Sequence, residues 1–406
     1  MPKSTIVSRR RRTWFPYQQI YEHLTFPNGY RHDKGFGLHS GNGLVSPDFA
    51  RGRWVRKDVK MTTPHAQIQR ADQAGIDAAV AVLRQGGLVV LPTETVYGLG
   101  ADASNDAAVA LIFAAKGRPS DHPLIVHVAS AAQVADYASE VPDFAARLIA
   151  AFWPGPLTLI LPRRTGVAAA AAGGQNSIGL RCPAHPVALA LLQACGTGLA
   201  GPSANRFGRV SPTTALHVQE ELGDALMVLD GGPCAVGIES TIVDCTRGRP
   251  VLLRPGLLTR AQLEAVCGQP VLDKDAPVSV AAPRASGTLE SHYAPNARVR
   301  LMDAKALQTA LDALTANNAA AAAQTSPGLV AVYARCTLRV STPALHRQMP
   351  DDAAAAAQQL FAVLRELDAL GVSQIWVQAP PDAPEWDGVR DRLGRAAADG
   401  SPPSRG

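Results

Sequence analysis

The sequence is poor in several features that would place it in a specialised class of protein. Its six cysteines are scattered over 406 residues without a Cys-x-x-Cys pair, which argues against a disulfide scaffold and a zinc knuckle. No apolar run reaches the length of a membrane span, so we expect no membrane partner and a cytoplasmic location. Charged residues make up 18% and hydrophobic residues 47%, a balance typical of a globular chain that can hold two or three domains.

Three signatures of nucleotide sites and hydrolases are missing as well. The Walker pattern Gly-x4-Gly-Lys-Ser/Thr does not occur, so a nucleotide site in this chain is not a P-loop. The Gly-x-Ser-x-Gly elbow is absent, which weakens a hydrolase interpretation of the serines. The carboxy-terminal third has no Gly-x-Gly-x-x-Gly, so a dinucleotide site is not supported there.

The net charge of +5 is concentrated at one end of the chain. Residues 1–60 hold 12 basic and 4 acidic side chains, a balance of +8. Residues 61–406 therefore carry the remaining 27 basic and 30 acidic side chains, a balance of −3. The body of the protein shows no electrostatic footprint for DNA or RNA.

The first sixty residues also differ in composition, with a single alanine in an otherwise alanine-rich chain. They show no helical or strand periodicity. We expect residues 1–60 to be a disordered amino-terminal extension, and Met61 to be the true start of translation. The alternative is a basic arm that contacts RNA.

Apolar spacing predicts a mixed α/β domain over residues 61–268, since helices and strands mix without strict alternation. Helices are expected over 71–85, 106–117, around 134, and over 143–152, 186–195, 213–222 and 258–268. Strands are expected over 88–93, 123–128, 156–162, 177–183, 198–205, 226–232, 240–246 and 250–256. 

Residues 269–296, rich in Pro, Ala and Ser, are expected to form an interdomain linker and lid. Strands over 298–302, 328–334 and 373–380 then alternate with helices over 304–314 and 352–370. This alternation predicts a small Rossmann-like carboxy-terminal domain over residues 297–406.

Basic side chains and hydroxyl groups gather where the expected strands end. Lys116, Arg118, Arg181 and Arg254 each lie beside Gly or Pro or on a strand, with serines nearby. Such a set suits a polyphosphate, because Arg and Lys neutralise its charge and hydroxyls donate hydrogen bonds. Each residue also has an ordinary structural interpretation, as a surface ion pair, a core histidine such as His127, or a serine that caps a turn. The residues taken singly leave both interpretations open.

Seven segments between Gly86 and Gly256, taken in order and spacing, resemble the YrdC-like threonylcarbamoyl-AMP synthases. They are PTETVYGLG, KGRPSDHPLIVHV, FWPGPLTLIL, IGLRCPAHP, PSAN with SPT, GIESTIVD and LLRPG. SHYAPN in the linker and RDRLGRAA near the end resemble the two-domain form of that family. The resemblance covers nearly all of residues 65–406.

The resemblance implies an α/β fold with a YrdC-like twisted mixed sheet around a concave cavity, plus the smaller Rossmann-like domain. It implies synthesis of threonylcarbamoyl-AMP and pyrophosphate from L-threonine, bicarbonate and ATP. Mg²⁺ would accompany ATP, with no metal held by the protein itself. The product would pass to the tRNA-modifying threonylcarbamoyl transferase machinery; the sequence does not decide whether this chain contacts tRNA directly.

The resemblance also assigns residues to substrates. Thr95, His127, Arg181, Gly201 and Ser240 would hold threonine. Arg118, His122, Ser177, Ser203, Asn205, Ser211, Arg254 and Tyr293 would hold ATP. Lys116, Arg118 and Arg181 would be the catalytic cations. His122 stands where many members have asparagine, and Gly201 where many have alanine.

Three other functions compete with this hypothesis. The first is a YrdC-like module that binds structured RNA without making an adenylate, which the balance of −3 in residues 61–406 argues against. The second is a carbamoyl-transferring relative of the hydrogenase-maturation type, but the acylphosphatase segment and Cys-x-x-Cys fingers of those proteins do not occur. The third is a structural ribosome-associated protein, for which a polar cavity has no use.

Overall fold

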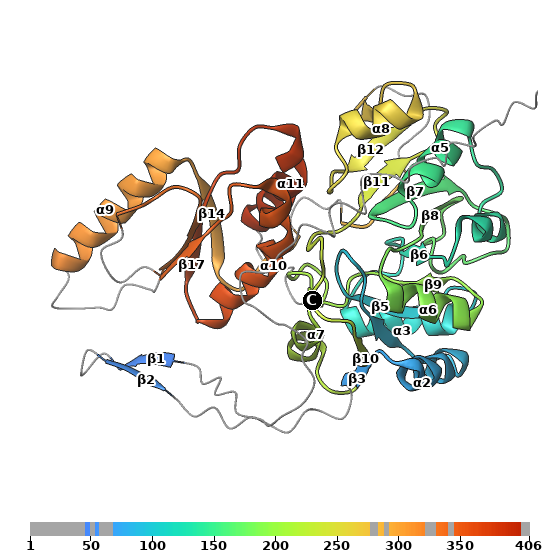
Figure 1. The fold of residues 1–406 in the computed structure, drawn as a ribbon, viewed down its shortest axis with the longest axis horizontal. Helices are drawn as coiled ribbons and strands as arrows, with labels where there is room; N and C mark the ends of the chain where they lie inside the picture. Colours follow the sequence, from blue (N-terminus) through green and yellow to red (C-terminus); the bar gives the residue numbers. More distant parts are fainter. Residues whose placement is uncertain are drawn as a thin grey trace, which may run out of the picture. The chain divides into compact units, whose positions relative to one another are not determined.

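The computed structural model describes residues 45–48, 53–56, 68–276, 283–287, 292–320, 330–339 and 345–398 (Figure 1). The chain divides into two compact units, residues 1–63 and 64–406. In the first unit, β1 (Val45–Asp48) and β2 (Arg53–Arg56) pair as antiparallel strands. The rest of the expected amino-terminal extension, including Met61, lies outside the described residues.

The second unit contains a mixed sheet of eleven strands within its described residues. Their spatial order is β13-β12-β11-β7-β8-β6-β9-β5-β4-β10-β3, with parallel and antiparallel neighbours interspersed. The strands are β3 (Ile68–Arg70), β4 (Val89–Leu91), β5 (Gly98–Asp102), β6 (Ile125–His127), β7 (Leu157–Pro162), β8 (Ser177–Arg181), β9 (Leu199–Ala200), β10 (Met227–Asp230), β11 (Thr241–Asp244), β12 (Val251–Arg254) and β13 (Leu272–Asp273). We call this part, residues 68–273, the large domain; it confirms the mixed α/β class.

Helices of the large domain begin and end where the sequence signals predict. They are α2 (Gln73–Arg84), α3 (Asp106–Lys116), α4 (Val134–Tyr137) with η1 (Ala131–Gln133), α5 (Asp143–Phe152), α6 (Pro186–Cys195), α7 (Ala215–Leu222) and α8 (Arg260–Cys267). Asn105 caps α3 by accepting from the N–H groups of Ala107 and Ala108. Gly117 ends α3 with φ of 62°, a left-handed conformation that costs glycine little, and the next residue is Arg118.

Two differences from the expected elements bear on the site. The stretch PTETVYGLG does not simply end a strand, because its last residues enter β5, which pairs antiparallel with β4. The expected linker also starts later than residue 269, since β13 still pairs with β12 in the large sheet.

The small domain, residues 298–398, is built on four strands that are all parallel, in the order β14-β17-β15-β16. Its elements are β14 (Arg298–Met302), α9 (Ala304–Ala320), β15 (Val330–Ala334), β16 (Leu345–Gln348), α10 (Ala353–Ala369), β17 (Gln374–Gln378), η2 (Pro384–Trp386) and α11 (Asp387–Ala397). Along β17, Ile375 packs in the core with α10 and α11, whereas Trp376 packs on the opposite face with α9. In Figure 1, α9 lies on one side of this sheet and α10 and α11 lie on the other.

One hydrophobic core joins the two domains. Val96, Val210 and Ile238 of the large domain belong to the same buried cluster as Leu360 and Leu364 of α10. The small domain is therefore packed on the large one through a shared core, next to the loop that carries Thr95. No helix in the described part of the chain is long and apolar enough to span a bilayer.

Candidate active site

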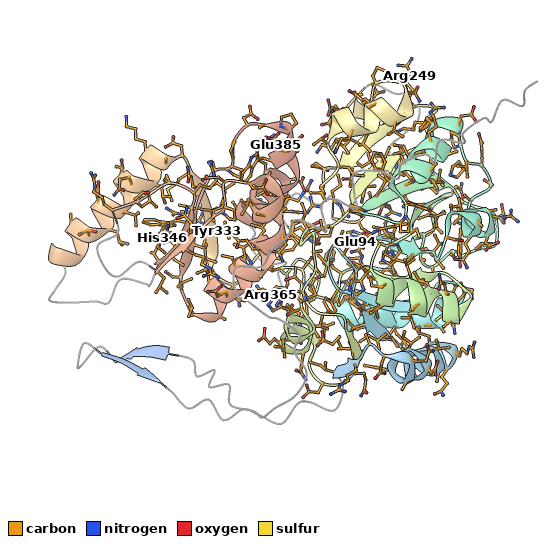
Figure 2. All side chains as sticks on the ribbon, in the orientation of Figure 1. Glu94, Arg249, Tyr333, His346, Arg365 and Glu385 are labelled. Carbon is orange, nitrogen blue, oxygen red and sulfur yellow. The ribbon has the colours of Figure 1, made fainter. Side chains whose placement is uncertain are left out.

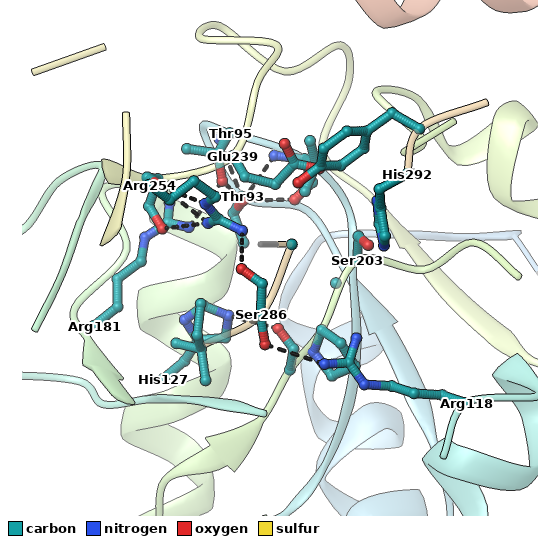
Figure 3. Close-up of a pocket in the computed structure, with 18 residues that line it drawn as sticks. Thr93, Thr95, Arg118, His127, Arg181, Ser203, Glu239, Arg254, Ser286 and His292 are labelled. Atoms are coloured by element: carbon teal, nitrogen blue, oxygen red, sulfur yellow. Dashed lines mark hydrogen bonds between the residues drawn. The ribbon is translucent and has the colours of Figure 1, made fainter. Parts of the chain in front are cut away.

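One cavity of about 530 Å³, including the space at its mouth, lies in the large domain beside the linker (Figure 3). Three strands of the large sheet end at this cavity, and the last residue of each lines it. These residues are His127 of β6, Arg181 of β8 and Arg254 of β12. Nine residues assigned from the sequence line this cavity: Thr95, Arg118, His127, Arg181, Gly201, Ser203, Ser240, Arg254 and Tyr293.

The loop between β4 and β5 is held by the hydroxyl of Thr93. This hydroxyl accepts from the N–H groups of Thr95 and Val96 at 3.2 Å each and donates to the carbonyl of Val96. It also lies 2.9 Å from the hydroxyl of Thr95, which is fully buried. The threonines are thus more than strand formers: they fix a tight polar turn at the cavity wall.

Arg181 is paired inside the protein. Its Nη2 lies 2.7 Å from Oε1 of Glu94, and its Nη1 donates to the hydroxyl of Thr95 at 2.8 Å. The Nε donates to the carbonyl of Gly155. Glu94 lies in the interior of the large domain (Figure 2), where its other oxygen accepts from the N–H of Ala184. The carboxylate fixes the guanidinium in orientation at the cavity wall.

His127 faces Gly201 across the cavity floor. Its Nε2 lies 3.1 Å from the carbonyl oxygen of Gly201, so Nε2 carries the proton and donates it to that carbonyl. Burial, and then the charge of Arg181, lowers the pKa of His127 to about 3. The imidazole is therefore neutral at physiological pH, and its Nδ1 remains an acceptor.

Arg118 and Arg254 converge on Ser286 of the linker from two sides (Figure 3). Nη2 of Arg118 donates to the Ser286 hydroxyl at 3.4 Å and to the Pro123 carbonyl at 3.0 Å. Nη1 of Arg254 donates to the Ser286 carbonyl at 2.9 Å, and its Nε and Nη2 donate to the carbonyl of Ser240. Within the described residues no carboxylate forms a salt bridge with either guanidinium, so their acceptors are neutral oxygens.

Tyr293 closes the cavity from the linker side. It is 1% exposed and adopts a positive φ of 63°. Its ring stacks on Phe361 of α10 at 5.4 Å between centroids and meets the edge of His292 at 4.2 Å. Its hydroxyl has no hydrogen-bond partner among the described residues, which leaves it available to a ligand.

The comparisons with known proteins agree with this geometry over both domains. The family described as "Telomere recombination", which groups Sua5, YciO and YrdC, matches residues 81–256, and "Threonylcarbamoyl-AMP synthase, C-terminal domain" matches residues 258–398. The threonylcarbamoyl-AMP synthase of Pyrococcus abyssi is 44% identical over 241 residues, which cover 58% of this chain and 70% of that protein. The synthase of Schizosaccharomyces pombe is 34% identical over 364 residues, covering 80% and 89%. This chain belongs to the threonylcarbamoyl-AMP synthase family.

Other relatives of the family extend this result. The Bacillus subtilis synthase is 45% identical over 230 residues, which cover 56% of this chain and 66% of that protein. Pyrococcus abyssi Sua5 in a crystal structure with L-threonine superposes with a TM-score of 0.72 at 36% identity, covering 81% of this chain and 96% of that one. The two-domain resemblance seen in the sequence is confirmed, and membership of a nucleotidyltransferase-type family disfavours the RNA-binding alternative.

Five residues assigned from the sequence lie outside the main cavity of this synthase-family chain. Ser177 lines a second cavity of about 280 Å³ that shares Ile125 and Ser286 with the first. His122 packs edge-on against Phe207 at 5.5 Å. These positions flank the Arg118 side of the site.

The other three lie behind the cavity wall. Lys116 donates from Nζ to the carbonyls of Ser203 and Asn205, and burial lowers its pKa to about 7. Asn205 donates to the carbonyls of Arg206 and Arg209. Ser211 donates to Glu239. Lys116 thus holds the loop that bears Ser203, so its assignment as a catalytic cation stays a prediction.

Sequence reasoning missed residues that the fold brings to the cavity, among them Thr93, Glu239, Ser286, Gly287 and His292. Glu239 and His292 lie in the segments GIESTIVD and SHYAPN. These motifs therefore indicated the correct part of the chain, but neither side chain was assigned to a substrate. Ser286 and Gly287 lie in a Pro- and Ala-rich stretch that carries no motif.

The lining offers little to a resident metal. Among the described residues no group of three or more His, Cys, Asp or Glu side chains could hold a metal ion. Glu239 is the carboxylate that lines the cavity, and each of its oxygens already accepts a hydrogen bond. This donor set fits a cation that arrives with a ligand's phosphates better than one held by the protein.

Proposed function

We propose that this chain makes L-threonylcarbamoyl-AMP and pyrophosphate from L-threonine, bicarbonate and ATP. The observation that carries the proposal is the uneven compensation of the cavity arginines. Arg181 is neutralised by Glu94, whereas within the described residues Arg118 and Arg254 form no salt bridge and donate to neutral oxygens. Two buried guanidinium groups without a carboxylate bound to them, on one side of a cavity, favour a polyanion there.

The two sides of the cavity would divide the substrates. Threonine would lie against Thr95, His127 and Arg181, with its carboxylate on the Arg181 guanidinium. Gly201 leaves space beside His127, and Ser240 adds a hydroxyl. The triphosphate would lie on the side of Arg118, Arg254 and Ser203, displacing the neutral groups of Ser286, with the nucleoside reaching toward Ser177 and Tyr293.

The chemistry needs no covalent intermediate on the protein. The threonine amine attacks the carbon of bicarbonate, water leaves, and a carbamate forms. A carbamate oxygen then attacks the α-phosphorus of ATP and pyrophosphate leaves. Arg118 and Arg254 stabilise the charge on the phosphates, and the closed, largely apolar wall at Tyr293 keeps water from the labile adenylate.

Mg²⁺ would accompany ATP and neutralise part of its phosphate charge. The product would pass in the cytoplasm to the tRNA-modifying threonylcarbamoyl transferase machinery. These two assignments rest on the chemistry of the family and of the cavity lining.

Pyrophosphate release by the full chain tests the proposal, with threonine or bicarbonate omitted in turn. We expect release only when ATP, threonine and bicarbonate are all present. Arg181→Ala is expected to raise the KM for threonine, and Arg254→Ala the KM for ATP, each by about ten-fold or more. Release that does not depend on threonine, or steeply salt-dependent tRNA binding without turnover, would contradict the proposal.

A further inference from the structure

A buried arginine of the small domain reaches the wall of the active site. Arg392 of α11 is 1% exposed and ranks among the largest fully buried side chains of the described residues. Its Nε donates to Oε2 of Glu239 at 2.8 Å, and its Nη2 donates to the carbonyl of Glu239 at 3.1 Å. Its Nη1 donates to the carbonyl of Pro255, the residue that follows Arg254, at 2.9 Å. One guanidinium thus holds two loops of the large domain.

The same guanidinium also contacts the linker. Its central carbon lies 5.4 Å from the centroid of the Tyr293 ring, a cation–π distance. Asp391 accepts from Nη1 at 2.7 Å and also pairs with Arg395 one turn along α11. The Asp391 carboxylate therefore orients the Arg392 guanidinium from within α11. The other N–H groups of Arg392 point toward the active site.

Glu239 links Arg392 to Ser211, one of the residues assigned to ATP. One of its oxygens accepts from Arg392 and the other accepts from the hydroxyl of Ser211. Burial alone would raise the pKa of Glu239, but Arg392, Arg254 and the Ser211 hydroxyl hold it below its usual value. The carboxylate is thus an anion locked between two donors at the cavity wall.

Two other polar contacts between the domains lie away from the cavity. Arg365 of α10 (Figure 2) donates to Glu221 of α7 at 3.0 Å and to the carbonyl of Val210. Arg209 pairs with Asp368 at 3.4 Å. These pairs and the shared core also hold α10 on the large domain, whereas Arg392 is the interdomain arginine that contacts Glu239, Pro255 and Tyr293 at the cavity wall.

We infer that Arg392 is a positioning residue for the ATP side of the active site, by which the small domain holds Glu239, the strand end at Arg254 and the ring of Tyr293 in their binding positions. The inference deepens the proposed function and rests on it. It gives the small domain a role in the reaction: without that domain, Glu239 would be a buried carboxylate facing Arg254 with one partner fewer.

The kinetic test compares Arg392→Met and Arg392→Lys with Arg365→Met, a matched loss of an interdomain arginine. Arg392→Met is expected to raise the KM for ATP by about ten-fold or more while the KM for threonine stays within about two-fold. Arg392→Lys restores part of the effect, since one ammonium can still reach Glu239. Arg365→Met lowers the urea midpoint but leaves the KM for ATP unchanged. Equal KM values for ATP in wild type and Arg392→Met would overturn the inference.

A binding test separates this inference from the proposed function. The affinity of the full chain for α,β-methylene-ATP is measured by calorimetry, which needs no turnover. If wild type binds the analogue but releases no pyrophosphate, the proposed function fails and the comparison with Arg392→Met still stands. We expect about ten-fold weaker binding in Arg392→Met.

A double variant covers the case in which Arg392→Met folds poorly. Glu239→Gln removes the buried carboxylate that Arg392→Met would leave without its guanidinium partner, so Glu239→Gln/Arg392→Met should fold. If Arg392 acts through Glu239, the loss of analogue binding in the double variant is smaller than the two single losses combined. Fully additive losses would count against the inference.

Discussion

The three cavity arginines differ in how the protein compensates their charge, and this difference assigns their roles. Glu94 neutralises Arg181, so Arg181 offers direction more than net charge. Burial lowers the pKa of Arg118 to about 10 and also lowers that of Arg254, which shows that both charges are held at a cost. A bound polyanion would offset that cost. Under the proposed function, Arg181 would then mark the amino-acid side of the cavity, and Arg118 and Arg254 the phosphate side.

Gly201→Ala tests the amino-acid side. A Cβ at this position would lie 2.5 Å from Cδ2 and 3.0 Å from Nε2 of His127, so the imidazole would have to move and lose its bond to the Gly201 carbonyl. We expect the KM for threonine to rise about five-fold, the equivalent of one hydrogen bond. Steady-state kinetics at saturating ATP measure it. Gly394→Ala, where a Cβ meets nothing within 4 Å, is the matched control.

An unchanged KM for threonine in Gly201→Ala would show that His127 moves without consequence. The sequence led to His127 and Gly201 through the family resemblance of their segments, because each residue taken singly also had a structural interpretation. It did not predict Glu94 as the partner of Arg181, since the two are far apart in the chain and only the tertiary fold brings the β4–β5 loop to the end of β8.

At the scale of elements, the linker is a part of the site. Ser286 accepts from Arg118 and Arg254, and Gly287 lies directly beside Tyr293 and Arg254. Helices and long apolar strands were predictable, because their periodicity is local. The strands β5 and β16 were not, because GLGAD has no β-branched residue and the exposed β16 has no alternation.

Gly287→Ala tests the linker. Gly287 has a φ of +69°, and a Cβ there would contact the Tyr293 hydroxyl and lie 2.7 Å from Nη1 of Arg254. We expect Tyr293 to be displaced and the KM for ATP to rise roughly ten-fold. Gly371→Ala has the same backbone strain, with φ of +71°, but its Cβ meets nothing within 4 Å.

Both glycine variants are expected to lose about 1 kcal/mol of stability from the left-handed backbone alone. A change in the KM for ATP confined to Gly287→Ala would attribute the effect to Tyr293. If both variants had the KM for ATP of the wild type, this part of the linker would not contribute to nucleotide binding.

At the scale of the whole molecule, the placement of Arg392 was beyond sequence reasoning. Arg392 and Glu239 are 153 residues apart, and RDRLGRAA shows a helix with charges but not which charge turns inward. Tertiary docking decides that, through the core that Val96, Val210 and Ile238 share with α10. His292 in the linker is buried and His217 in α7 is half-buried, so histidines from several regions titrate together with global unfolding.

Acid is therefore expected to destabilise the whole molecule. Burial lowers the pKa of His127 and His292 to about 3, and burial with Arg365 nearby lowers that of His217 to about 4. In the unfolded chain a histidine has a pKa of about 6.5. Above that pH these histidines do not reduce the free energy of unfolding. As the pH falls below it, the unfolded chain binds protons that the folded chain excludes, so the free energy of unfolding decreases. At pH 5 each such histidine lowers the free energy of unfolding by about 2 kcal/mol.

Urea unfolding of wild type, His217→Gln and His346→Gln at pH 7 and pH 5 measures this effect. From pH 7 to pH 5, the free energy of unfolding of His217→Gln is expected to fall by about 2 kcal/mol less than that of wild type. The reason is that glutamine does not titrate, so the unfolded variant binds one proton fewer. His346 is exposed on β16 (Figure 2), so His346→Gln should follow wild type. If His217→Gln and His346→Gln lost equal stability on acidification, the half-buried imidazole of His217 would not be a source, and His127, His292 or carboxylates such as Glu239 would have to account for the acid sensitivity.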